Sequence, residues 1–216
     1  MAPKDETRSE LDERSGVSRR FFLKTVGAGG VAASVIDGLQ EALPHAQEAG
    51  TAAAPAAIGP GPVPITLNVN GQRLSLKVEP RTTLLDALRN HAGQTGNKRV
   101  CDRGSCGACT MIIDGRTRYA CSTLAIEAQG HDIRSIEGLA KGTVLHPVQQ
   151  AFAEADGMMC GFCTPGFVMS AVALLEKNPH PTVEEAKRAL DGNICRCGTY
   201  VRVLEAALKT KGVARG

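Results

Sequence analysis

Eight cysteines among 216 residues are the side chains of this chain most able to do chemistry. They fall into three groups, which are Cys101, Cys106 and Cys109 with Cys121, then Cys160 with Cys163, then Cys195 with Cys197. The spacings within these groups are C-x4-C-x2-C, C-x2-C and C-x-C. Thiols at such spacings bind metals, form disulfides or act as redox pairs. The surrounding sequence must decide among these uses.

The first group has the spacing by which a plant-type ferredoxin holds a 2Fe–2S cluster, with a fourth cysteine further along the chain. Gly104 and Gly107 let the loop wrap closely around a cluster, so that backbone N–H groups can point at the thiolate sulfurs. An Asp-Gly pair at 114–115 predicts a hairpin that returns Cys121 beside Cys109. We therefore predict one 2Fe–2S cluster on the first four cysteines.

Zinc and disulfides are the alternatives at this first group. Zinc sites usually combine two C-x2-C pairs, and the x4 gap fits that pattern poorly. Disulfides are the default for an exported chain with an even number of cysteines. Both alternatives stay open until metal and absorption are measured.

The other four cysteines lie just before predicted helices. The C-x2-C pair precedes an apolar run at 167–175, and the C-x-C pair precedes a helical run at 200–209. The positive end of a helix favours thiolate, so two such pairs facing each other would supply four thiolate ligands. A disulfide within C-x-C would be strained. No thioredoxin-like βαβ pattern surrounds the C-x2-C pair.

The elements that must position these cysteines change in kind along the chain. Alternating apolar residues at 65–69 and 74–78, separated by Asn70-Gly71, predict a β-hairpin. The pair Thr82-Thr83 supplies an N-cap for a short helix at 84–89, and 133–139 reads as one more strand and a turn. Helical patterns follow at 147–154, 167–175, 182–190 and 200–209. Four short helices predict a small bundle, and the whole pattern predicts an α+β chain.

The N-terminal residues have the layout of an export signal. Arg19 and Arg20 precede an apolar run that reaches about residue 36, which is too short and too weakly apolar for a membrane-spanning helix. Residues 18–24 resemble the S-R-R-x-F-L-K pattern of twin-arginine (Tat) signals. Residues 46–64 are rich in Ala, Pro and Gly and are predicted to be a linker. We expect a signal region at 1–45, the Tat translocase as a partner and a periplasmic location.

The cysteine motifs, in this order, resemble the iron–sulfur subunit of the molybdenum hydroxylases, the xanthine dehydrogenase and aldehyde oxidoreductase family. The resemblance rests on C-x4-C-x2-C-x11-C, on C-G-F-C-T-P-G at 160–166 and on G-N-I-C-R-C-G at 192–198. It extends from about residue 65 to about residue 208. It implies a β-grasp 2Fe–2S ferredoxin-like domain at 65–140, followed by a four-helix-bundle 2Fe–2S-binding domain at 141–216.

The resemblance also implies two ligand sets, namely Cys101, Cys106, Cys109 and Cys121 for one cluster and Cys160, Cys163, Cys195 and Cys197 for the other. The chain would carry electrons from a large molybdopterin-containing subunit, which oxidises an aldehyde or a heterocycle, to a FAD-binding subunit or a cytochrome. Molybdopterin and FAD would lie in those partners, and no catalytic residue is expected in this chain.

Two departures from the family pattern concern the molybdopterin contact. Met159 stands where the family usually has a glutamine that contacts the pterin. The last motif reads C-R-C-G-T-Y where C-R-C-T-G-Y is more usual. Both put the pterin contact in question and leave the clusters untouched.

Other functions are excluded or left as alternatives by composition. A net charge of +3 is too small to indicate a nucleic-acid partner, and no nucleophile–base arrangement, H-E-x-x-H motif or phosphate loop occurs. A free-standing electron carrier and an exported binding protein held by disulfides or zinc remain as alternative functions. Five basic residues surround the first cysteine loop and either dock an acidic redox partner or form a solvated surface, namely Lys98, Arg99, Arg103, Arg116 and Arg118.

Overall fold

The computed structural model describes residues 58–210 together with Arg20 and Gly212. The predicted signal region and most of the predicted linker therefore lie outside the described residues. Within the described part, no helix has the length and apolarity needed to cross a membrane.

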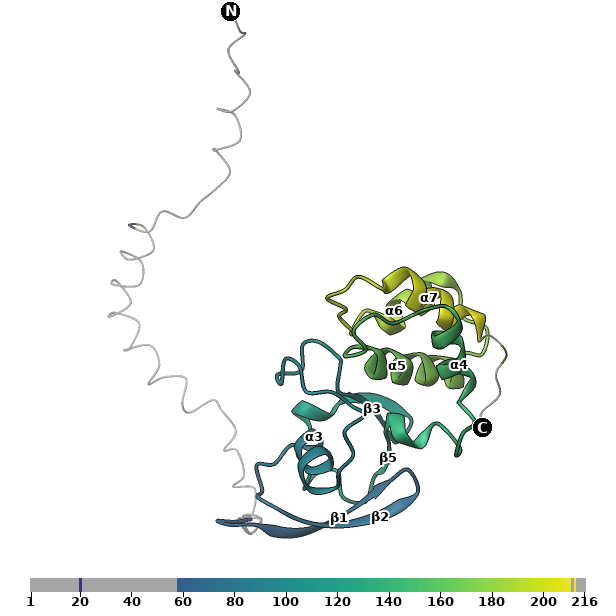
Figure 1. Cartoon of the computed structure of the whole chain (residues 1–216). Coiled ribbons are helices and arrows are strands. Elements are labelled where there is room, and N and C mark those ends of the chain that lie inside the picture. The colour runs from purple at the N-terminus through teal and green to yellow at the C-terminus, as the bar shows by residue number, and fades with distance from the viewer. Residues whose placement is uncertain (1–19, 21–57, 211, 213–216) are drawn as a thin grey trace, which may run out of the picture. The chain divides into compact units, whose positions relative to one another are not determined.

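A five-stranded sheet with strand order β2-β1-β5-β3-β4 forms the first half of the described chain (Figure 1). Strands β1 (Val63–Val69) and β2 (Gln72–Val78) form an antiparallel hairpin. Asn70 and Gly71 both have positive φ, of 53° and 74°, as the predicted Asn-Gly turn requires.

Strand β1 begins two residues before the predicted run, and it includes Pro64. Strand β1 pairs with β5 only at Asn68 and Val69. At Pro64, the side of β1 that faces away from β2 therefore has no neighbouring strand. A proline lacks the backbone N–H of a ladder hydrogen bond, so this unpaired side is where it can be accommodated.

The second hairpin comprises β3 (Thr110–Ile113) and β4 (Arg116–Tyr119). Strand β4 is an edge strand of the sheet. Strand β5 (Asp132–Arg134) lies between β1 and β3, parallel to the first and antiparallel to the second. A short helix, α3 (Leu84–Asp86), is capped by the Thr83 hydroxyl as predicted. It continues as one π-helical turn, Ala87–His91.

Four helices follow, in the positions that the sequence predicts. They are α4 (Pro147–Glu154), α5 (Thr164–Lys177), α6 (Val183–Leu190) and α7 (Tyr200–Lys209). Thr182 and Glu185 form the capping box of α6. Helix α5 begins three residues earlier than the predicted apolar run, so that Cys163 is its N-cap residue. A cysteine thus lies directly at the positive end of this helix.

The two faces of the sheet pack against different cores. On β3, Met111 and Ile113 join α3 in one hydrophobic core, and Ile112 points to the opposite face and joins the core of α4–α7. Figure 1 shows α5 lying along β3. The guanidinium of Arg134 in β5 donates two hydrogen bonds of 2.6 Å to Glu176 in α5. The two halves of the described chain are therefore packed together through the sheet, within one compact unit.

Candidate metal centres

The β3–β4 hairpin brings Cys109 and Cys121 together, as predicted. Thr110 pairs with Tyr119, and the N–H of Ala120 donates to the carbonyl of Cys109 at 3.3 Å. Cys109, just before β3, and Cys121, just after β4, therefore lie at the same end of the hairpin. The Cys121 thiol lies close enough to Cys109 to influence its pKa.

The loop before β3 adds the other two cysteines of this set. The Cys106 thiol lies close enough to Cys101 and to Cys109 to influence the pKa of both thiols. All four cysteines of the first predicted set thus gather at one place.

Backbone N–H groups of this loop point at sulfur. The N–H of Gly104 donates to Cys121 Sγ at 3.2 Å, and the N–H of Ser105 donates to Cys101 Sγ at 3.4 Å. Gly104 has a φ of +69°, and a Cβ at this position would lie 2.7 Å from the hydroxyl of Ser122. The loop therefore needs glycine at this position in order to aim its amides at the thiols.

These surroundings shift the pKa values of Cys101 and Cys109 in opposite directions. Burial raises the pKa of Cys101, but the N–H groups of Arg103 and Ser105 outweigh it, so that its pKa falls to about 7. Burial, reinforced by the neighbouring Cys121 thiol, raises the pKa of Cys109 to about 12. A buried thiol of this kind becomes a thiolate only when a cation balances its charge.

The second set gathers around the N-terminus of α5. Cys195 lies close enough to Cys163 to influence its pKa, and Cys160 lies close enough to Cys197 to influence its pKa. Burial raises the pKa of Cys163 to about 12. The pKa of Cys195 is also raised by burial, but the Thr199 hydroxyl at 3.2 Å and the Thr199 N–H lower it overall to about 7.

All eight cysteines are free thiols, so no disulfide joins either set. In the part of the chain that the structure describes, no group of three or more His, Cys, Asp or Glu side chains is placed to hold a single metal ion. Two sets of four thiols, with amides aimed at sulfur, fit a pair of sulfide-bridged irons, because such a pair does not require its ligands to converge on one atom. The same donors fit a mononuclear tetrahedral zinc site less well.

The two cysteine sets are held together by the side chain of Asn193, which is 4% exposed. Its Nδ2 donates to the carbonyl of Gly107 at 2.9 Å and to Thr110 Oγ1 at 3.3 Å. Its Oδ1 accepts a hydrogen bond of 2.7 Å from the hydroxyl of Ser170 in α5. We call this arrangement the Asn193 latch.

A second contact beside the Asn193 latch joins the cysteine loops directly. The N–H of Ile194 donates to the carbonyl of Cys106 at 2.9 Å. Ile194 precedes Cys195, so a covalent path interrupted by one hydrogen bond connects a cysteine of the first set to a cysteine of the second. The hydroxyl of Tyr119 donates to the carbonyl of Gly192 at 2.9 Å and closes the same junction.

Two glycines let the loops come this close. A Cβ at Gly166, in the first turn of α5, would collide with the carbonyl oxygen of Gly107. A Cβ at Gly107 would collide with the carbonyl of Gly192 and the amide of Asn193. From the sequence, Gly107 was expected to let the loop wrap around a cluster, whereas Asn193, Gly166 and Tyr119 were not identified as parts of the site. The partners of the Asn193–Gly107 hydrogen bond are 86 positions apart, which local patterns do not reveal.

Two family profiles match the chain. The profile for the 2Fe-2S iron-sulfur cluster binding domain matches residues 67–134, and that for the 2Fe-2S binding domain of the second type matches residues 135–208. The chain is thus built from two different 2Fe–2S binding domains.

Relatives place this pair of domains in one family. The aldehyde oxidoreductase iron-sulfur-binding subunit PaoA of Escherichia coli O157:H7 is 42% identical over 206 residues, covering 88% of this chain and 86% of that protein. The nicotine 6-hydroxylase small subunit of Paenarthrobacter nicotinovorans is 48% identical over 150 residues, covering 69% of this chain and 90% of that protein.

Solved structures agree with these relatives. Quinoline 2-oxidoreductase from Pseudomonas putida 86 matches with a TM-score of 0.67 and 39% identity, over 69% of this chain and 92% of that chain. Aldehyde oxidoreductase from Desulfovibrio gigas matches with a TM-score of 0.66 and 38% identity, over 70% of this chain but only 17% of that chain. The chain belongs to the iron–sulfur subunits of the molybdenum hydroxylases, and the predicted family and fold class are confirmed.

We predict that Asn193→Ala destabilises the protein by about 3 kcal/mol, because the carbonyl of Gly107 and the hydroxyl of Ser170 lose a buried partner. Thermal unfolding followed by circular dichroism would show a melting temperature lowered by several degrees. The control is Asn90→Ala, which truncates an exposed asparagine. Equal melting temperatures for the two variants would show that the latch contributes nothing to stability.

Proposed function

We propose that this chain is an electron-transfer subunit that carries two 2Fe–2S clusters. It takes electrons from a molybdopterin-containing subunit that oxidises an aldehyde or a heterocycle, and it passes them to a FAD-binding subunit or a cytochrome. The observation that carries this proposal is the gathering of eight free thiols into two sets of four, linked by the Ile194–Cys106 hydrogen bond. Each cluster, when bound, supplies a one-electron centre.

The residues that would hold the clusters follow the two sets. The first cluster would be held by Cys101, Cys106, Cys109 and Cys121, and the second by Cys160, Cys163, Cys195 and Cys197. The amides of Gly104 and Ser105 stabilise negative sulfur in the first set. The Thr199 hydroxyl does so in the second set. These contacts lower the cost of burying thiolates.

An apolar surface surrounds the second set and supports a lasting partner there. We call it the apolar collar, and it consists of the exposed residues Met158, Met159, Phe162, Ile194, Tyr200 and Val201. Met159 and Val201 are 71% and 80% exposed and line one surface hollow together. Contiguous exposed apolar groups mark protein interfaces, and the more apolar interfaces are the obligate ones. We assign the apolar collar to the large molybdopterin subunit.

The relatives limit the chemistry of that subunit. The names of the related proteins specify aldehyde, nicotine or quinoline as the compound acted on, and they support the proposal that the partner of this chain oxidises an aldehyde or a nitrogen heterocycle. A free-standing carrier is disfavoured, because it would leave the apolar collar in water.

Iron analysis and EPR test the two ligand sets. We expect about four Fe per chain and two distinct EPR signals after reduction. Cys121→Ser should remove one signal and Cys195→Ser the other, because each variant deletes a ligand from a different set. Zinc in place of iron, the absence of metal, or loss of the same signal in both variants would contradict the assignment.

Substitution in the apolar collar tests the lasting partner. Val201→Asp places a charge at the most exposed collar residue, and we expect the chain to keep its iron but to lose its co-purifying large subunit. The matched control is Val183→Asp, also at an exposed valine but at the start of α6, where an acidic side chain suits the helix. Co-purification unchanged in Val201→Asp would place the partner elsewhere.

We also propose that residues 1–45 direct export to the periplasm through the Tat translocase. The support is the paired arginines before a short apolar run. Transport of a folded chain would let the clusters be inserted before the thiols meet an oxidising compartment.

Replacement of Arg19 and Arg20 by lysine should therefore leave both this chain and its large subunit in the cytoplasm. Cell fractionation with antibodies to both proteins measures this outcome. A large subunit that still reaches the periplasm when this chain is retained would contradict shared transport.

A further inference from the structure

The basic residues around the first cysteine loop separate into two kinds in the structure. Lys98 and Arg103 donate to backbone carbonyls of their own loop, and Arg99 lies in an ion pair with a carboxylate. Among residues 58–210, no ion pair or hydrogen bond engages the side chain of Arg116 or Arg118. Two guanidinium groups are therefore available to a partner.

Both arginines lie on β4, the edge strand of the sheet. They are two positions apart, so their side chains leave the same face of the strand, and both are exposed. Strand β4 ends at Tyr119, two residues before Cys121 of the first cysteine set. Ser122, which lines the hollow beside β4, has its hydroxyl 3.7 Å from Cys121 Sγ. The edge strand that carries Arg116 and Arg118 thus ends beside the predicted site of the first cluster.

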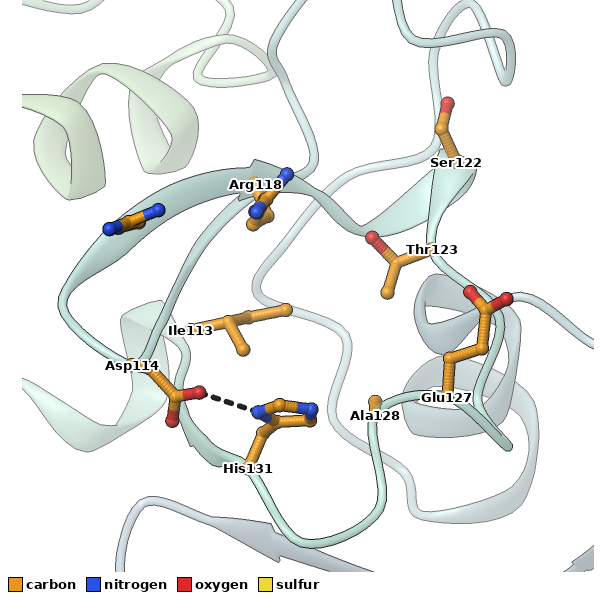
Figure 2. Close-up of a pocket in the computed structure, with 9 residues that line it drawn as sticks. Ile113, Asp114, Arg118, Ser122, Thr123, Glu127, Ala128 and His131 are labelled. Carbon is orange, nitrogen blue, oxygen red and sulfur yellow. Dashed lines mark hydrogen bonds and ion pairs between the residues drawn. The ribbon is translucent and has the colours of Figure 1, made fainter.

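Two hollows border β4 and are lined by residues of this strand. One hollow of about 540 Å³ is lined by Arg116, Arg118, Ser122 and Thr123, among others. A second, of about 560 Å³, shares the last three of these and adds Arg188. Figure 2 shows the first hollow, with Arg118 on β4 and with Glu127 and the Asp114–His131 pair on other walls.

The negative groups of the first hollow do not neutralise the arginines. The carboxylate of Asp114 accepts hydrogen bonds from His131 Nδ1 at 2.5 Å and from the N–H of Asp132 at 2.9 Å. Glu127 is an exposed carboxylate on a different segment of the chain, and within residues 58–210 no hydrogen bond or ion pair joins it to either arginine. An incoming acidic group would therefore meet Arg116 and Arg118 with both guanidinium groups free.

We propose that an acidic, extended segment of the protein that accepts electrons from this chain docks along the free edge of β4, with its carboxylates on Arg116 and Arg118. This inference rests on the proposed electron-transfer function. Guanidinium groups bind carboxylates in a two-pronged geometry, and an unpaired strand edge can accept another strand. The net charge of the chain is too small for a nucleic-acid partner, which leaves an acidic protein as the occupant.

The character of this surface also fixes the kind of complex it makes. Attraction between exposed charges speeds association, and salt weakens this attraction. Such charges add less to lasting affinity than apolar contacts do. The β4 edge is thus suited to an acceptor that binds and leaves, in contrast to the apolar collar at the second set. A cluster held by the first cysteine set would, once reduced, supply the one electron that the acceptor gains, and no bond would be made or broken.

Electron transfer to a haem protein of known charge tests the proposal. The full chain, reduced anaerobically, is mixed by stopped flow with the ferric soluble domain of cytochrome b5, an acidic protein, at low ionic strength. Each ferric haem gains the one electron that the chain loses. We expect Arg116→Glu/Arg118→Glu to lower the second-order rate at least tenfold, and we expect about 0.2 M salt to remove most of the difference.

The matched control is Arg73→Glu/Lys77→Glu, which makes the same change of charge at exposed positions on β2, the opposite edge of the sheet. We expect this control to change the rate less than twofold. Basic ferric cytochrome c should not be slowed by the β4 variant, and all proteins should reduce p-benzoquinone, an uncharged oxidant, at one rate. Equal losses in the β4 and β2 variants, or a wild-type rate insensitive to salt, would overturn the proposal.

Failure of the docking proposal can be separated from failure of the proposed function. Iron content and EPR on the same samples show whether clusters are present. Binding of ferric cytochrome b5, followed by calorimetry at low ionic strength, needs no cluster in this chain. Wild-type binding that the β4 variant loses would support the docking surface. Binding that is equal in all variants would refute it, whatever the iron content.

Discussion

The hydrogen bonds of the buried Asn193 amide are the constraint on which the arrangement of this site depends. The amide meets the first cysteine loop, strand β3 and helix α5 at once, through Gly107, Thr110 and Ser170. A buried amide with all of these partners has one orientation, and each partner would be left unsatisfied if the loops moved apart. The distance between the two cysteine sets is therefore set by packing and by directional hydrogen bonds.

Glycines make this constraint possible in two ways, by the absence of a Cβ atom and by access to positive φ. Gly107 and Gly166 remove the Cβ atoms that would hold the loop away from α5. Gly104 adopts a positive φ so that its N–H reaches Cys121. The cost is conformational entropy, and the hydrogen bonds to sulfur and through Asn193 offset it. The same close approach brings the N–H of Ile194 to the carbonyl of Cys106. The close approach that these glycines allow thus also gives a bonded connection between the two sets, interrupted by one hydrogen bond.

Local elements and cysteine grouping were predictable from sequence because their signals are local. Asn70-Gly71 and Asp114-Gly115 specify turns, Thr182 with Glu185 specifies a cap, and the hairpin spacing returns Cys121 to Cys109. The junction was not predictable, because it joins residues far apart in the sequence. The apolar pattern of α5 begins only at Phe167, but Pro165 marks the first turn of the helix, as a proline near a helix start predicts, and α5 begins at Thr164. The His146 cap of α4 was missed because histidine is an unusual N-cap.

The two cysteine sets also differ in what surrounds them, and this gives the proposed relay a direction. Around the second set, exposed apolar groups such as Met159 and Val201 favour a partner that stays bound, because their exposure to water is unfavourable. Beside the first set, the free guanidinium groups of β4 are fully compatible with water, so they can lose a partner at little cost. Electrons would then enter at the second set, from a subunit that stays bound there. They would leave at the first set, to an acceptor that binds reversibly. The rigid Asn193 latch between them keeps the path between the sets unchanged while the acceptor binds and leaves.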